Sequence, residues 1–231
     1  MGRLILVRHG QSIWNLENRF TGWIDVTLSK KGIEEAKKAG KKLKEYKIDI
    51  AFTSHLIRAQ ETLYEILRKN KYAKIYLRVH EEKKNYLYYN NINKEVIEEI
   101  ENEVVKIFTS EALNERYYGD LQGLNKDDMK KKVGEEKVHI WRRSFDVPPP
   151  NGESLKDTIE RVKPYFDSRI KPLILEGKTV IISAHGNSLR AVTKFLENIS
   201  DEKIPNVEIP TGVPIIYDFN ENFEIISKKE L

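Results

Sequence analysis

The sequence contains no cysteine, which excludes a disulfide framework and any thiol chemistry. It also contains no apolar run that approaches the length of a membrane span, so we expect no membrane partner. The chain begins directly with an apolar segment, and we therefore expect no signal peptide. Together these absences favour a soluble protein of the cytoplasm.

An excess of one sign of charge is absent too, although 33% of the residues are charged. The 40 basic residues nearly balance the 36 acidic ones, and the formal net charge is +4. Lysines alternate with glutamates along helical stretches, a pattern typical of solvated helix faces. We therefore expect no nucleic-acid partner, and the small basic excess suits small anionic substrates. A length of 231 residues fits one α/β domain, or two small domains at most.

An apolar run near the start of the chain, Leu4-Ile5-Leu6-Val7, stops abruptly at Arg8-His9-Gly10. Such a run before a breaker predicts a buried strand, typical of a parallel sheet that is covered on both faces. Arg8 and His9 would then lie at the carboxyl end of the strand, where open α/β sheets bind ligands. Since arginine binds phosphate oxygens and neutral histidine is a nucleophile, the pair predicts phosphoryl transfer through a phosphohistidine.

A second apolar run of the same kind, residues 179–184, ends in His185-Gly186-Asn187-Ser188. Two strands that each deliver His-Gly at the carboxyl end can place two imidazoles in one crevice. A surface arginine beside a core histidine is the plain alternative for a single tripeptide, because a tripeptide is a weak motif. The second copy favours a site over that alternative. A zinc centre is disfavoured because the two histidines lack a third obvious ligand.

Six ordered segments resemble the histidine phosphatase superfamily and, within it, the bisphosphoglycerate-dependent phosphoglycerate mutases of glycolysis. They are residues 6–12, 15–25, 53–59, 113–126, 141–143 and 184–190. The resemblance implies an α/β fold, a three-layer sandwich with a mostly parallel central sheet flanked by helices. It also implies a single phosphoglycerate mutase-like domain over residues 1–231, with an atypical inserted segment at about residues 69–109.

The resemblance further implies that 2,3-bisphosphoglycerate primes His9 and that 3- and 2-phosphoglycerate are interconverted in glycolysis and gluconeogenesis without a metal. Glu115 would act as the acid/base, with a pKa raised by the anions of the substrate. The implied catalytic residues are His9, Glu115, His185, Arg8 and Arg58. The implied substrate-binding residues are Asn15, Thr21, Gly22, Arg116, Tyr118, Lys126, Arg142, Arg143, Gly186 and Asn187. The implied partners are small-molecule phosphoglycerates, and a homo-oligomer is left open.

Two rival functions stay open. A phosphatase of the same superfamily would pass the phosphoryl group of His9 to water instead of to a sugar acid. A binding module would only recruit phosphorylated partners, and the intact catalytic set argues against it. The close match over residues 115–126 favours the mutase. Gln11 departs from the usual Glu of these mutases, and loss of that charge is expected to lower the pKa of His9 slightly.

Apolar periodicity predicts the remaining elements. We expect strands at 49–54, 72–79, 213–219 and 223–227. We expect helices at 30–46, 56–67, 97–108, 125–133 and 139–145, one from 154 to 173 with a kink at Pro164, and one starting at 186. The few residues after Ser227 are too short a tail to cover a crevice, so a phosphatase side activity is expected unless residues 81–109 form a lid.

Overall fold

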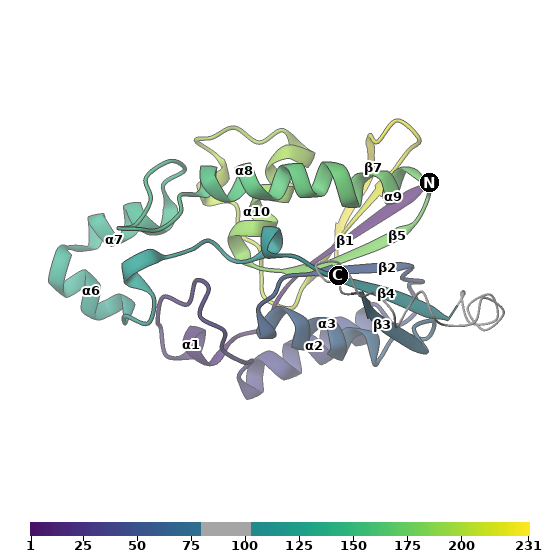
Figure 1. The fold of residues 1–231 in the computed structure, drawn as a ribbon, viewed down its shortest axis with the longest axis horizontal. Coiled ribbons are helices and arrows are strands. Elements are labelled where there is room, and N and C mark those ends of the chain that lie inside the picture. Colours follow the sequence, from purple (N-terminus) through teal and green to yellow (C-terminus); the bar gives the residue numbers. More distant parts are fainter. Residues whose placement is uncertain (80–102) are drawn as a thin grey trace.

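The computed structural model describes residues 1–79 and 103–231. Within them, a seven-stranded sheet runs in the order β3-β4-β2-β5-β1-β6-β7 (Figure 1). The strands are β1 (Gly2–Arg8), β2 (Ile50–Thr53), β3 (Ile75–Val79), β4 (Val104–Thr109), β5 (Thr179–Ala184), β6 (Pro214–Phe219) and β7 (Ile225–Glu230). The first five strands are mutually parallel, and β6 and β7 add antiparallel pairs at one edge.

Helices cover both faces of this sheet, which confirms the predicted three-layer α/β architecture (Figure 1). One layer contains α2 (Lys30–Lys42) and α3 (Ile57–Leu67); the other contains α8 (Leu155–Tyr165), α9 (Lys171–Leu175) and α10 (Gly186–Glu197). Alternation along β1 supplies both cores, since Leu4 and Leu6 pack with the α8 layer and Ile5 and Val7 with the α2 layer. Among the described helices, none combines the length and apolar character that crossing a membrane requires.

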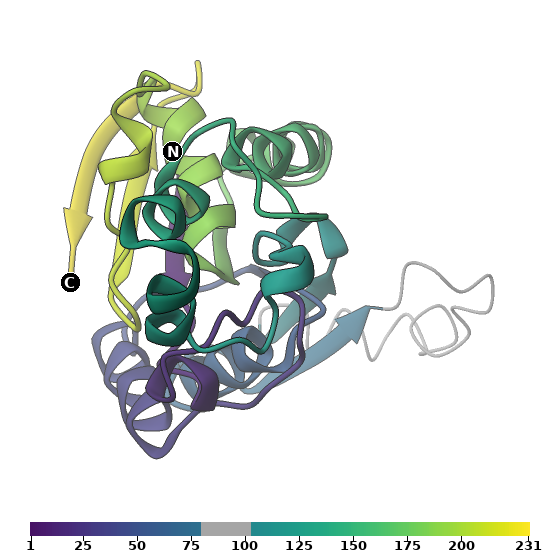
Figure 2. The same ribbon diagram turned by 90° about the vertical axis from the view of Figure 1, so that its left-hand side faces the viewer.

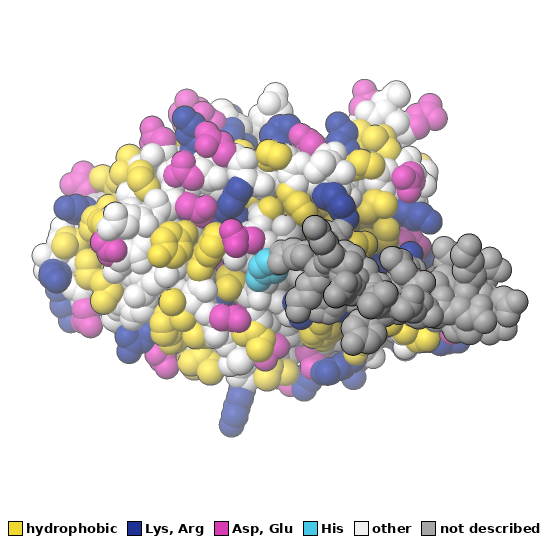
Figure 3. Space-filling view, viewed as in Figure 1, with side chains coloured by type: hydrophobic (Ala, Val, Ile, Leu, Met, Phe, Trp, Pro, Cys, Tyr) yellow, Lys and Arg dark blue, Asp and Glu magenta, His cyan; other side chains and the backbone are white. Residues whose placement is uncertain are grey.

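A third region lies beyond the carboxyl ends of the parallel strands. It contains α1 (Ile13–Leu16), α6 (Lys126–Val133), α7 (Glu135–Arg143) and short 3-10 turns at Glu111–Leu113, Gly119–Leu121 and Ile204–Asn206. Its own small core is built from Phe20, Leu121, Met129, Val138 and Trp141. Figure 2 views the molecule from this end, where loops and short helices stand over the strand ends. On the face shown in Figure 3, basic and acidic side chains are interspersed, as the alternating sequence pattern predicts.

The predicted helix at 97–108 is wrong where the structure describes it. Residues 104–109 form β4, which lies between β2 and β3 and pairs with both in parallel. The period of two is visible in the burial of Val105 and Ile107, and the glutamates that precede this strand obscured it. Both described ends of the segment 69–109 therefore belong to the central sheet as β3 and β4. Of the proposed lid, residues 81–109, the stretch 104–109 is strand β4 of the central sheet, and the stretch 81–102 lies outside the described residues.

Other elements differ from prediction at their ends. The helix capped by Ser29 ends at Lys42 instead of 46, α7 begins at Glu135 instead of His139, and β3 begins at Ile75 instead of 72. Pro164 does not simply kink its helix. It is followed by a π-helical stretch, Phe166–Ile170, before α9 begins, and proline and π-helical turns are both usual sites of helix irregularity.

Candidate active site

The two His-Gly sequences lie side by side because β1 and β5 are neighbours in parallel register, with Arg8 opposite Ala184. The backbone N–H of His9 donates to the carbonyl of Ala184 at 2.9 Å. The imidazole rings of His9 and His185 follow directly, with centroids 4.9 Å apart, and both side chains are buried. The predicted pairing of two imidazoles at the carboxyl edge of the sheet is therefore present.

The ring of His9 is held in one tautomer. Its Nδ1 lies 2.6 Å from the carbonyl oxygen of Gly10. Because a carbonyl only accepts hydrogen bonds, Nδ1 carries the proton, and the lone pair is on Nε2. A Cβ atom at Gly10 would lie 2.2 Å from the carbonyl oxygen of Gly32, so glycine is required for this close approach. Burial, and then the charges of Arg58 and Arg8, hold the pKa of His9 well below its ordinary value, so the ring is neutral at neutral pH.

His185 is the N-cap residue of α10, and its backbone N–H donates to Ser188 Oγ at 3.1 Å. Its Nε2 lies 2.7 Å from Ser54 Oγ, while its Nδ1 is buried without a hydrogen-bond partner among the described residues. Burial, followed by the charge of Arg58, also lowers its pKa well below the ordinary value. The site therefore contains two neutral imidazoles in contact.

Arg8 and Arg58 are oriented by backbone carbonyls. Arg58 donates to Gly22 at 2.7 Å and Ile24 at 3.0 Å, and Arg8 donates to Ile209 at 2.9 Å. The Nε atoms of both arginines are buried and have no protein acceptor among the described residues. Burial lowers the pKa of Arg58 to about 10, so it stays charged at neutral pH. The exposed fraction of Arg58 is 1%, so this arginine does not face solvent.

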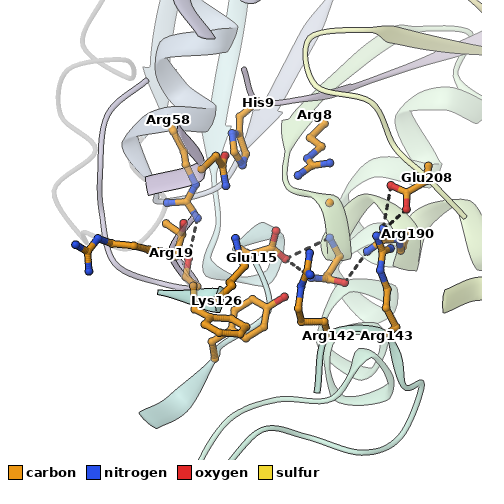
Figure 4. A pocket seen from close by; sticks show the side chains of 17 residues that line it. Arg8, His9, Arg19, Arg58, Glu115, Lys126, Arg142, Arg143, Arg190 and Glu208 are labelled. Atoms are coloured by element: carbon orange, nitrogen blue, oxygen red, sulfur yellow. Dashed lines mark hydrogen bonds and ion pairs between the residues drawn. The ribbon is translucent and has the colours of Figure 1, made fainter. Parts of the chain in front are cut away.

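Glu115 lies across the pocket from His9 (Figure 4). One carboxylate oxygen accepts from the backbone N–H of Arg116 at 2.7 Å, and from the N–H and Nδ2 of Asn187 at 3.2 and 2.8 Å. Burial raises the pKa of Glu115, but these hydrogen bonds and the charges of Arg8 and Arg58 outweigh it and lower the pKa. Glu115 is therefore ionised in the ligand-free site, and the raised pKa expected beside substrate anions stays a prediction for the ligand-bound site.

Cationic side chains surround the far end of the pocket, opposite His9. Lys126, Arg142 and Arg143 come from α6 and α7 and line this end (Figure 4). Tyr118 lines the same pocket. Burial, and then the charge of Arg142, lower the pKa of Lys126 to about 8. A pocket with cations at both ends fits a ligand that is anionic at both ends.

Most of the predicted site residues line one pocket. They are Arg8, His9, Asn15, Thr21, Gly22, Arg58, Glu115, Tyr118, Lys126, Arg142, Arg143, Gly186 and Asn187. The two predicted residues outside its lining, His185 and Arg116, are fully buried behind it. Arg116 Nη2 donates to Tyr118 Oη and to the carbonyl of Arg142, both at 3.0 Å. Arg116 therefore holds the lining residues Tyr118 and Arg142 in place.

Four lining residues were missed by the sequence analysis: Arg19, Phe20, Arg190 and Glu208. Arg190 lies three residues after Asn187 on α10 and donates to its Oδ1 at 3.0 Å. Since residues three apart lie on the same face of a helix, this spacing from Asn187 could have marked Arg190 as a site residue. Glu208 lies in a loop before β6, and no local pattern marked it.

Gln11 does not face the nucleophile. Its side-chain oxygen accepts from Ser29 Oγ at 2.9 Å, and its backbone N–H donates to Glu35 at 2.8 Å, both at the start of α2. The low pKa of His9 has the other causes given above, namely burial, Arg58 and Arg8.

Within residues 1–79 and 103–231, no cluster of three or more His, Asp or Glu side chains could hold a metal ion.

The sequence matches the model of the histidine phosphatase superfamily (branch 1) over residues 4–84 and 94–228. It is 49% identical over 231 residues, 100% of both chains, to a Pseudoalteromonas atlantica protein named 2,3-bisphosphoglycerate-dependent phosphoglycerate mutase. It is 50% identical over 228 residues, 98% of this chain and 94% of the other, to a Schizosaccharomyces pombe protein named phosphoglycerate mutase. Bacillus stearothermophilus YhfR shares the fold with a TM-score of 0.74, at 22% identity over 96% of this chain and 93% of that one.

The two neutral histidines predict a pH dependence of stability. Below pH 6.5 the unfolded chain binds protons at His9 and His185 that the folded protein does not bind, so the free energy of unfolding falls as the pH falls. The slope approaches about 1.4 kcal/mol per pH unit for each histidine. Denaturant unfolding of the wild type and of His185→Gln between pH 7.5 and 5 measures it. The slope of the free energy of unfolding against pH should be smaller for the variant, by about the contribution of one histidine. Equal slopes for the two proteins would contradict a neutral His185 in the folded protein.

Proposed function

Because the chain belongs to the histidine phosphatase superfamily, we propose that it is a phosphoglycerate mutase that works through phospho-His9 and is primed by 2,3-bisphosphoglycerate. The observation that carries the proposal is the neutral His9, whose free Nε2 belongs to a pocket with cations at both ends. Phosphoglycerates and their bisphosphate have anionic groups at both ends, so the residues present fit these ligands. Relatives of the same name along the full length support this choice of substrate.

His9 Nε2 forms the bond to phosphorus while the bond from phosphorus to the leaving oxygen breaks. Arg8 and Arg58 offset the negative charge of the transferring group, and their Nε groups, which have no acceptor in the described part of the chain, are available donors. The N-terminus of α10 adds backbone N–H groups and the positive end of a helix dipole at Gly186. Neutral His185 is in ring contact with His9 and adds a polar group to the same end.

Glu115 carries one proton back and forth. In the phosphorylated enzyme, the ionised carboxylate takes the proton of the glycerate hydroxyl as that oxygen attacks phosphorus. In the reverse step Glu115 returns the proton to the leaving oxygen, so no proton is gained or lost over a cycle. The lowered pKa of the free site suits the accepting step, and anionic ligands raise it toward the donating step.

Lys126, Arg142 and Arg143 hold the far end of the substrate, with its carboxylate and distal phosphate. Thr21, whose buried hydroxyl has no partner among the described residues, is a further donor, and Asn15 and Gly22 complete that wall of the pocket. Cations perform the charge compensation that a metal supplies in other phosphoryl-transfer enzymes, so the reaction needs no metal.

The chain would act in glycolysis and gluconeogenesis, in the cytoplasm, on small phosphoglycerates and without nucleic-acid or membrane partners. Residues 1–231 would form a single domain, with the segment 69–109 as its atypical part. The described ends of that segment, β3 and β4, extend the central sheet, which supports one domain over two.

A transfer assay separates the mutase from a phosphatase or a binding module. The protein is incubated in EDTA with 2,3-bisphosphoglycerate labelled in its phosphoryl groups, and acid-labile, base-stable label on the protein is trapped. We expect labelling of the wild type, none of His9→Ala, and rapid transfer of the label to added 3-phosphoglycerate. Discharge to water at the same rate with and without 3-phosphoglycerate indicates a phosphatase. Absence of label on the wild type, restored by a divalent metal, would overturn the metal-free mechanism.

Replacing Glu115 tests its role as proton carrier. Glu115→Gln keeps an oxygen that can accept from Arg116 and Asn187, but it removes the titrating group. We expect mutase turnover to fall by about 10²–10⁴-fold. Phosphorylation of His9 by an aryl phosphate should be largely spared, because its leaving group needs no proton. Glu111→Gln, on an exposed side chain of the preceding turn, is the matched control and should retain turnover. If Glu115→Gln slows phosphorylation of His9 by the aryl phosphate as much as it slows mutase turnover, Glu115 is not the proton carrier.

A further inference from the structure

One segment, residues 204–211 before β6, which begins with the 3-10 turn Ile204–Asn206, holds several arginines of the pocket. Carbonyl oxygens of alternate residues in this segment accept hydrogen bonds from three different guanidinium groups. The pairs are Pro205 with Arg143 at 3.4 Å, Val207 with Arg190 at 2.6 Å, and Ile209 with Arg8 at 2.9 Å. The end of the segment is tied to β1, since the N–H of the next residue, Gly212, donates to the carbonyl of Arg8 at 2.9 Å. Segment 204–211 thus orients arginines at both ends of the site.

Glu208 belongs to the same segment, but it contributes a carboxylate instead of a carbonyl. Its oxygens lie 2.7 Å from Arg143 Nη2 and 3.7 Å from Arg190 Nη2 (Figure 4). Glu208 and Glu115 are the two acidic residues that line the pocket in the described chain. They differ in setting, because Glu115 accepts backbone and amide N–H groups, whereas the Glu208 side chain is 65% exposed and has two guanidinium groups as its ion-pair partners.

We propose that Glu208 is a specificity-determining residue that occupies Arg143 in the free protein and gives way to an anionic group of the substrate. This inference rests on the proposed function, in which Arg143 holds the far end of a phosphoglycerate. The exchange costs little free energy because an exposed ion pair contributes little to stability. The Glu208 side chain is 65% exposed and can turn into solvent.

The exchange makes binding depend on the far end of the ligand. A ligand with anionic groups at both ends replaces the contact that Glu208 makes with Arg143. A small anion bound only at Arg8, Arg58 and His9 leaves the Glu208–Arg143 pair in place. Removing the charge of Glu208 therefore frees Arg143 for two-ended ligands and leaves small anions largely unaffected.

Binding to the dephosphorylated protein, without primer and hence without turnover, tests this by calorimetry. We expect Glu208→Gln to lower the Kd of 3-phosphoglycerate by about threefold to tenfold and to leave the Kd of inorganic phosphate within about twofold. The difference between variant and wild type for 3-phosphoglycerate should shrink at high salt, because exposed charge pairs are screened. Glu202→Gln makes the same change of charge on an exposed residue that does not line the pocket, and it should change neither Kd.

Three results overturn the inference: unchanged binding of 3-phosphoglycerate to Glu208→Gln, weaker binding, or an equal gain for both ligands. Weaker binding would assign Glu208 to holding Arg143 in place, and an equal gain would reflect net charge alone. Failure of the proposed function looks different, because wild-type protein would then bind 3-phosphoglycerate no more tightly than inorganic phosphate.

Discussion

The hydrogen bond between His9 Nδ1 and the carbonyl of Gly10 is the contact on which the chemistry depends. It leaves the lone pair on Nε2, and burial together with two arginines keeps the ring neutral. Gly10 can place that carbonyl only because it has no side chain, since its Cα packs against the backbone of Gly32 at the start of α2. The tautomer and the orientation of His9 are thus set by the backbone geometry that the sheet and α2 impose together.

The arginines of the site are held mainly by carbonyl oxygens. Arg58 is bonded to the Gly22 and Ile24 carbonyls, and Arg8 to that of Ile209. A carbonyl orients a guanidinium group without cancelling its charge, so the full positive charge stays available to a phosphoryl group. Among the described residues, two carboxylates line this cationic pocket: Glu115, the proposed proton carrier, and Glu208, the proposed exchangeable partner of Arg143.

Local sequence predicted the centre of the site better than its edges. Two apolar runs that end in His-Gly were enough to place His9 beside His185, because parallel neighbouring strands end at the same edge. Strand β4 was mistaken for helix, since its identity depends on pairing with β2 and β3. Glu208 was missed because its role comes from tertiary contacts with distant arginines. The direction of the Glu115 pKa shift likewise depends on an amide 72 residues away, that of Asn187.

The most direct measurement of the central claim is the identity of the phosphorylated atom. Phosphoenzyme trapped from 2,3-bisphosphoglycerate is digested under alkaline conditions, and the labelled peptide and its phosphohistidine isomer are determined. Since Nδ1 of His9 is engaged by Gly10, the phosphate should be found on Nε2 of His9. Phosphate on Nδ1 of His9, or on either nitrogen of His185, would contradict the mechanism.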